Sequence, residues 1–169
     1  MKLIEALKQI KDLQKKADDL REKVTKHSAH LNIETPVYPD QKKQVKEWIQ
    51  AHSDILKEIL RLRLAIQRTN LATMVTIEVD GKSVEKSIAE WIHRRRDLAI
   101  EELKMWQGLS DRGLKEGTIK QSTDQLVEVK IVRCYDPEER DRKQFALGSE
   151  PSIIDGKLEI VNAVTDLIQ

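Results

Sequence analysis

Apolar positions near the N-terminus follow the alternating three- and four-residue spacing that is typical of a coiled-coil helix. The positions are Leu3, Ala6, Ile10, Leu13, Ala17, Leu20, Val24 and Leu31. Lys, Glu, Asp and Gln fill most places between them, so the spacing predicts a helix over about residues 2–31 that buries one narrow face. Pro36 and Pro39 remove backbone donors and disfavour helical conformations in the residues before them. Residues 32–40 are therefore predicted to form a loop.

Two further amphipathic segments follow this loop. Asp40 is a suitable N-cap for a helix over about residues 41–69, and Ser83 is a suitable N-cap for a helix over about residues 84–107. The expected apolar stripe of the second helix consists of Val45, Trp48, Ile49, Ile55, Leu56, Ile59, Leu62 and Ile66. Both segments should bury one face against a neighbouring helix.

Short stretches between and after the helices have the pattern of strands. Residues 73–79 are rich in β-branched side chains and alternate in polarity, and Asp80-Gly81 after them is a tight-turn signal. Residues 125–133 also alternate, which predicts a strand. The charged run 136–143 is either a solvated helix or a mobile loop, and residues 158–168 return to helical spacing.

These elements predict a mainly α fold in a single domain over residues 1–169. Short connections between successive helices favour an antiparallel helical bundle or a coiled-coil hairpin. Residues about 73–79 and 125–133 are expected to add a short β-hairpin or a small sheet.

Composition agrees with long solvated helices and excludes several classes of protein. Charged residues make up 35% of the 169 residues and aromatic residues only 4%, which argues against a β-sandwich or a barrel. The formal net charge of +1 gives no global field that would attract nucleic acid or an acidic membrane. The single cysteine, Cys134, rules out an internal disulfide and fits a small buried filler. With no signal peptide or membrane span apparent, we expect a cytoplasmic protein.

Signatures of catalysis are missing from the sequence. It contains no phosphate-binding glycine loop, no nucleophile elbow and no calcium loop. His27 and His30 lie three residues apart, but no third ligand is nearby, so a structural role is the better interpretation. We therefore expect no enzymatic activity, no catalytic residue, no cofactor and no metal site.

Two clusters of basic residues are the main candidates for chemistry. Residues 61–68 hold three arginines and no acidic residue, and residues 93–96 read His-Arg-Arg-Arg. At about 100° per residue, Arg63 and Asn70 fall near the centre of the apolar face of the second helix, and Arg95 near that of the third. A buried guanidinium needs a partner, because an unpaired buried charge costs several kcal/mol.

Two interpretations of these arginines remain open. In the first, they form structural ion pairs with Glu58, Glu102 or a neighbouring subunit. In the second, Arg63 and Arg95 face a cleft and bind a phosphate or carboxylate through their planar forks. Polar side chains close to the first cluster would complete such a site: Thr69, Asn70 and Thr73.

The central segment Arg68-Thr69-Asn70-Leu71-Ala72-Thr73 resembles the Arg-Thr-Asn-x-Ala-Thr centre of a family of small helical proteins labelled septicolysin-like. The opening Met-Lys-Leu, the Asp80-Gly81-x-Ser83 turn and the strand at 127–132 occur in the same order as in that family. The resemblance covers most of residues 1–133. It implies that Arg68, Thr69, Asn70 and Thr73 are of functional interest, but it names no ligand. Residues 140–156 look like an insertion relative to the family.

The sequence therefore predicts a non-catalytic protein that sequesters a small phosphate-bearing ligand, such as a nucleotide or cyclic nucleotide signal. By analogy alone, phage-encoded sponges that inhibit host defence have a similar size and lack catalytic residues. The long seam favours a homo-oligomer built from dimers. The alternative is a coiled-coil adapter that binds another protein through the seam from Leu3 to Leu31. A nucleic-acid binder is the weakest hypothesis, because acidic residues dilute the basic ones.

Overall fold

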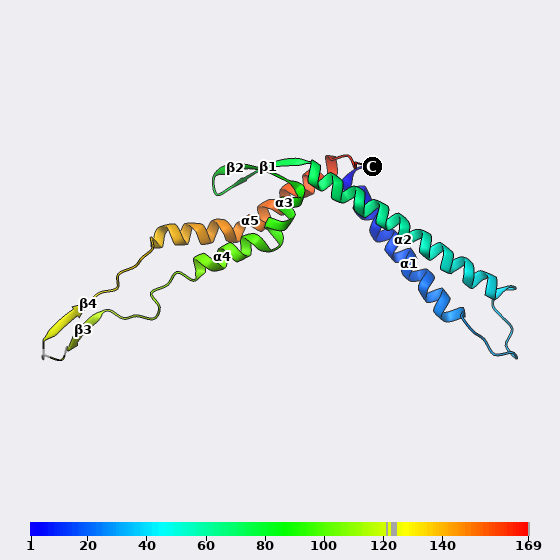
Figure 1. Cartoon of the computed structure of the whole chain (residues 1–169), viewed down its shortest axis with the longest axis horizontal. Coiled ribbons are helices and arrows are strands. Elements are labelled where there is room, and N and C mark those ends of the chain that lie inside the picture. The colour runs from blue at the N-terminus through cyan, green and yellow to red at the C-terminus, as the bar shows by residue number, and fades with distance from the viewer. Residues whose placement is uncertain (121, 123–124, 169) are drawn as a thin grey trace. The chain divides into compact units, whose positions relative to one another are not determined.

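The computed structural model describes residues 1–120, 122 and 125–168 of the chain (Figure 1). Its elements, in chain order, are α1 (Leu3–His27), α2 (Gln41–Ala72), β1 (Met74–Val79), β2 (Lys82–Ser87), α3 (Ile88–His93), the π-helical turn η1 (Arg94–Leu98), α4 (Ala99–Gln107), β3 (Gly117–Lys120), β4 (Leu126–Val129) and α5 (Pro137–Val164). The predicted mainly α fold with small β elements is confirmed.

The chain divides into two compact units, each described here by itself. The first unit comprises Met1–Met74, Ser87–Ala89 and the chain from Leu158 onward. The second unit comprises Val75–Lys86 and Glu90–Lys157.

An antiparallel hairpin of α1 and α2 forms most of the first unit (Figure 1). Its core is a strip of buried apolar side chains with three further apolar residues packed against it. The buried residues are Ala6, Ile10, Ile59, Leu62 and Ile66, and the partly buried ones are Leu13, Ile55 and Leu167. The predicted seam of α1 is confirmed up to its last turn. The expected extension to residue 31 is wrong: α1 ends at His27 and Leu31 is 62% exposed.

Three aromatic rings pack against one another where the loop joins α1 to α2. The rings of His27, Tyr38 and Trp48 contact one another with centroids 5.2–5.7 Å apart. Gln41 Nε2 donates a hydrogen bond to the carbonyl of His27, and the Asp40 side chain accepts one from the amide of Lys43. The predicted cap at Asp40 is thus confirmed, and His27 has a packing role.

Backbone and side-chain hydrogen bonds tie the chain after α5 to the first unit. The amide of Leu3 donates to the carbonyl of Thr165, and the amide of Leu167 donates to the carbonyl of Met1. The hydroxyl of Thr69, a buried residue of α2, accepts from the amide of Ile168 at 2.9 Å. The predicted helix over 158–168 therefore ends early, at Val164, where an extended segment begins.

The β1–β2 hairpin of the second unit turns at the predicted Asp80-Gly81. Both residues have positive φ angles, 50° and 70°, as a tight hairpin turn requires. The predicted helix start at residue 84 is wrong, because β2 continues to Ser87 and α3 begins at Ile88. On a strand, the side chains of Lys82, Val84 and Lys86 point to one face, and those of Ser83 and Glu85 point to the other.

Both predicted strand segments are confirmed, each in its own two-stranded sheet, and the insertion relative to the septicolysin-like family stays a prediction. β1 pairs with β2, and β4 pairs antiparallel with β3, with Gly117 opposite Val129, so 73–79 and 125–133 contribute to two separate sheets. Residues 140–156 belong to α5, which also settles the charged run 136–143 as helix from Pro137 onward. Pro151 lies inside this helix and obscured its pattern. Its buried apolar positions, Leu147, Ile154 and Leu158, follow helical spacing.

Replacement of Thr69 by valine tests the tie between α2 and the C-terminal segment. Thr69→Val keeps the shape of the side chain but removes the acceptor of the Ile168 amide. We expect the free energy of unfolding to fall by about 1–2 kcal/mol in urea titrations, since the part-buried amide of Ile168 loses its partner. The matched control is Thr25→Val in α1, where the hydroxyl is exposed and bonds only within its own helix. A control loss as large as that of Thr69→Val would contradict this account.

Candidate phosphate-binding pocket

A pocket of about 320 Å³ lies in the second unit among β1, β2, the α3–η1–α4 segment and α5. It combines apolar walls with charged side chains of both signs. The lining residues are Val79, Asp80, Lys82, Val84, Lys86, Trp91, Arg94, Glu102, Lys143, Ala146, Leu147 and Glu150. Four cationic side chains thus face three carboxylates, and the distribution of ion pairs decides which charges remain for a ligand.

Arg94 forms ion pairs with two of the carboxylates, and its single positive charge leaves this group of three with one net negative charge. Its guanidinium forms a bidentate pair with Glu150, with Nε–Oε1 and Nη2–Oε2 distances of 2.5 and 2.9 Å. Its third nitrogen, Nη1, lies 2.6 Å from Oε2 of Glu102. The Glu150 side chain is only 7% exposed, and its hydrogen bonds raise the pKa of Arg94 above the usual value although burial opposes the shift. The pair therefore stays charged and fixes α5 against η1.

A π-helical turn presents two consecutive arginines to α5. η1 covers Arg94–Leu98, and both Arg94 and Arg95 form ion pairs with α5 residues, Glu150 and Asp155 respectively. On a regular α-helix, Arg95 and Glu102 would share one face, because they lie seven residues apart. The wider π turn changes the helical phase, so Glu102 pairs with Arg94 instead.

Asp80, the third carboxylate of the pocket, also has cationic partners. Lys143 Nζ lies 2.5 Å from its Oδ2, and Arg142 Nη1 lies 3.6 Å from its Oδ1. The hydrogen bond from Lys143, followed by its positive charge, lowers the pKa of Asp80 below the usual value for an aspartate. Asp80 is therefore ionised at neutral pH and paired.

Lys82 and Lys86 are the cations that these pairs leave over. They lie four residues apart on the same side of β2, with Val84 midway between them, and all three line the pocket. In the described part of the chain, neither ammonium group has a carboxylate within ion-pair distance. The four cations and three carboxylates of the lining leave a net charge of +1, and Lys82 and Lys86 are the cations outside the ion pairs, although the charge of Lys82 also acts on Asp80.

Trp91 provides apolar surface for the pocket and is held rigidly. It is 1% exposed, and its indole Nε1 donates a hydrogen bond to the carbonyl of Val75 at 2.9 Å. Leu147 of α5 is buried beside the same pocket. Apolar walls with a few placed charges are typical of sites for small molecules.

The residues that the sequence suggested as ligand-binding do not coincide with this pocket. Arg63, Arg68, Thr69, Asn70 and Thr73 belong to the first unit, whereas Arg95 belongs to the second. Among the described residues, neither Arg63 nor Arg68 has an ion-pair partner, and both are exposed. The expected burial of Arg63 is wrong. The predicted apolar stripe of α2 includes Ile49 and Leu56, which are exposed in the structure. Including them moves the predicted centre of the buried face toward Arg63.

The remaining candidates have partners of other kinds. The Thr69 hydroxyl donates to the carbonyl of Ala65 and accepts from Ile168, and the Thr73 amide caps α2 by donating to the carbonyl of Thr69. Arg95 pairs with Asp155, in agreement with the interpretation as a structural ion pair. Asn70 differs, because its Oδ1 is buried without a hydrogen-bond partner in the described structure.

Sequence analysis missed Lys82 and Lys86. The signal was present in the alternating Lys82-Ser83-Val84-Glu85-Lys86, which follows directly on a hairpin turn. The prediction of Ser83 as a helix cap is wrong, because Ser83 lies within β2, where Lys82 and Lys86 share one face.

The described residues contain neither a membrane-spanning helix nor a cluster of metal ligands. None of the helices there is long and apolar enough to cross a membrane. No group of three or more His, Cys, Asp and Glu side chains in that same part is arranged to hold a metal ion.

Comparison with known proteins shows similarity of fold. No family model matches the chain, and no curated protein matches it. It is similar to the crystal structure of a functionally unknown conserved protein from Corynebacterium diphtheriae, with a TM-score of 0.58 and 21% sequence identity. The match covers 99% of this chain and 98% of that one. The fold therefore has a counterpart among solved structures, and the proposed resemblance to septicolysin-like proteins stays a prediction.

Substitutions of the two consecutive arginines should have unequal effects on stability. We expect Arg94→Met to lower the free energy of unfolding by about 3–5 kcal/mol, because it leaves the buried Glu150 charge unpaired. Arg95→Met should cost less than about 1 kcal/mol, since its partner Asp155 is 61% exposed. Arg94→Met combined with Glu150→Leu should recover most of the loss. Equal losses for the two single variants in chemical denaturation would contradict this assignment.

Proposed function

We propose that the protein binds a small phosphate-bearing molecule, such as a nucleotide, in the pocket of the second unit and releases it unchanged. The observation that carries this proposal is the unpaired positive charge of Lys82 and Lys86 on the wall of a defined pocket. A phosphate group accepts charge-assisted hydrogen bonds from two ammonium groups on one strand face.

The size and the walls of the pocket suit the remainder of such a ligand. Its volume of about 320 Å³ lies at the lower end of the usual range for small-molecule sites, about 300–1,000 Å³. Val84, Ala146 and Leu147 offer apolar contact to a sugar or a base. A phosphate alone would leave this apolar surface uncovered.

The state of the carboxylates supports binding rather than turnover. Glu150 and Glu102 are held by Arg94, and Asp80 is held by Lys143. A general base works best when its pKa lies near the working pH, whereas the pKa of Asp80 is lowered further from neutrality. The carboxylates of the pocket are therefore fixed in ion pairs, which suits binding of a ligand better than proton transfer.

A coiled-coil adapter is the second candidate function, and it needs a surface other than the one first expected. α2 packs against the seam of α1 at Ala6, Ile10 and Leu13, which leaves little of this part of the seam for a partner. The exposed apolar residues on the other side of α2 offer an alternative surface and are considered below.

Thermal unfolding with a matched set of nucleosides and nucleotides tests the proposed function. AMP should raise the melting temperature and adenosine should not, because only AMP carries the phosphate. By mass action the gain is about 2.7 kcal/mol at a ligand concentration a hundredfold above Kd. Chromatography of the ligand released by heating should return it unaltered.

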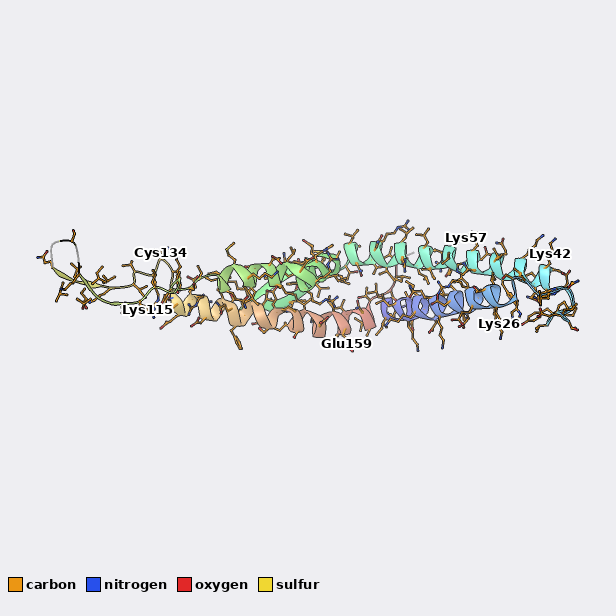
Figure 2. All side chains as sticks on the ribbon, turned by 90° about the horizontal axis from the view of Figure 1, so that it is seen from below. Lys26, Lys42, Lys57, Lys115, Cys134 and Glu159 are labelled. Carbon is orange, nitrogen blue, oxygen red and sulfur yellow. The ribbon has the colours of Figure 1, made fainter. Side chains whose placement is uncertain are left out.

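Lysine variants locate the bound ligand. Lys82→Gln combined with Lys86→Gln should weaken AMP binding at least about tenfold, since two charge-assisted hydrogen bonds are lost. The control, Lys115→Gln, removes an exposed lysine outside the pocket, shown in Figure 2, and should bind like the unchanged protein. Equal weakening by the control variant, or no shift with any phosphate compound, would contradict the proposal.

A further inference from the structure

A stripe of exposed apolar side chains follows α2 on a face that the hairpin does not cover. It consists of Ile49, Leu56, Leu60, Leu64 and Leu71, each 44–67% exposed, with Ser53 and Gln67 in the same line. We call these seven residues the α2 stripe. At 1.5 Å per residue it extends over about 33 Å, the length of a coiled-coil contact rather than of a single chance exposure.

The α2 stripe is palindromic about Leu60. Its successive spacings are four, three, four, four, three and four residues, which read the same in both directions. The polarity is symmetric as well: Ile49 corresponds to Leu71, Ser53 to Gln67 and Leu56 to Leu64. A stripe that packs against a different protein has no reason to be symmetric about its midpoint.

From this symmetry we infer that α2 pairs with α2 of a second copy in an antiparallel two-fold contact centred on Leu60. Each layer then matches like with like: Leu60 meets its own copy, Leu56 meets Leu64, and Ile49 meets Leu71. The polar pair of Ser53 and Gln67 falls in one shared layer and fixes the register. A closed two-fold contact of this kind is self-complementary and ends with the dimer.

Charges beside the stripe allow two copies to approach. On the side of α2 turned away from α1, where Figure 2 shows Lys57, two basic residues have acidic partners. Lys57 lies 3.0 Å from Asp54, and Arg61 lies 2.7 Å from Glu58. Two copies of this edge therefore meet as neutral pairs at these positions, whereas Arg68 of the same edge has no ion-pair partner among the described residues.

The opposite edge of the stripe carries an arginine with no ion-pair partner among the described residues, Arg63. It lines a groove together with Leu56, Leu60 and Asp18 of α1, and Asp18 is paired with Arg21 of the same groove at 2.9 Å. In the antiparallel arrangement, Arg63 of the second copy comes level with Lys57 and would share Asp18 with Arg21.

Cysteine cross-linking tests both the dimer and its direction. In a Cys134→Ser background, Leu60→Cys should form a disulfide-linked dimer with itself under mild oxidation. Ile49→Cys alone and Leu71→Cys alone should remain unlinked, but an equimolar mixture of the two should cross-link. Efficient linkage of Ile49→Cys with itself would show parallel helices and would overturn the inference.

Sedimentation measures the association without cross-linking. The unchanged protein should sediment at twice 19.6 kDa at tens of micromolar, and Leu60→Lys should raise the dimer Kd at least about a hundredfold. Ile33→Lys, which alters an 85% exposed residue of the α1–α2 loop, is the control and should stay dimeric. Circular dichroism should show unchanged helix content in both variants, since both residues are exposed in the protomer. A monomeric unchanged protein, or a dimeric Leu60→Lys variant, would overturn the inference.

Discussion

The bidentate pair between Arg94 and Glu150 is the interaction on which the second unit depends. A carboxylate as buried as Glu150 is costly unless a partner compensates it, so the two segments that carry the pair have little freedom to separate. The same guanidinium also forms an ion pair with Glu102, so the positions of both carboxylates are fixed. This arrangement leaves Lys82 and Lys86 as the unpaired charges of the pocket wall, and from this imbalance we derive the proposed affinity for phosphate.

The first unit has a different basis. Its core is a single strip of small and branched apolar side chains between two helices, and hydrogen bonds from the C-terminal segment secure one end of it. A two-helix core of this kind buries little apolar surface for its length and leaves the outer faces of both helices to solvent. The α2 stripe is one of these faces, and the proposed pairing of two copies would bury it. The two proposals thus concern different units and are independent of each other.

Local patterns in the sequence predicted much of the fold. The three–four spacing of α1, the cap at Asp40 and the turn at Asp80-Gly81 depend on residues close together in the chain, and all three are confirmed. The errors arose where tertiary packing decides. Pro151 concealed the continuity of α5, and the period-2 lysines of β2 were assigned to a helix. The candidate site could not be found in the same way, because partners such as Arg94 and Glu150 lie 56 residues apart. Which arginines are neutralised and which lysines remain unpaired is decided by these distant contacts, and spacing along the chain does not report them.

Site-resolved NMR of the lysines tests the central claim, phosphate binding at Lys82 and Lys86, most directly. Reductive methylation with ¹³C-formaldehyde labels each amine and keeps its positive charge, and single Lys→Arg variants assign the signals. On titration with AMP, the account predicts saturable shifts of the Lys82 and Lys86 resonances, whereas the Lys104 and Lys115 resonances stay in place. Shifts of equal size at all exposed lysines, or none at Lys82 and Lys86 at millimolar AMP, would contradict it.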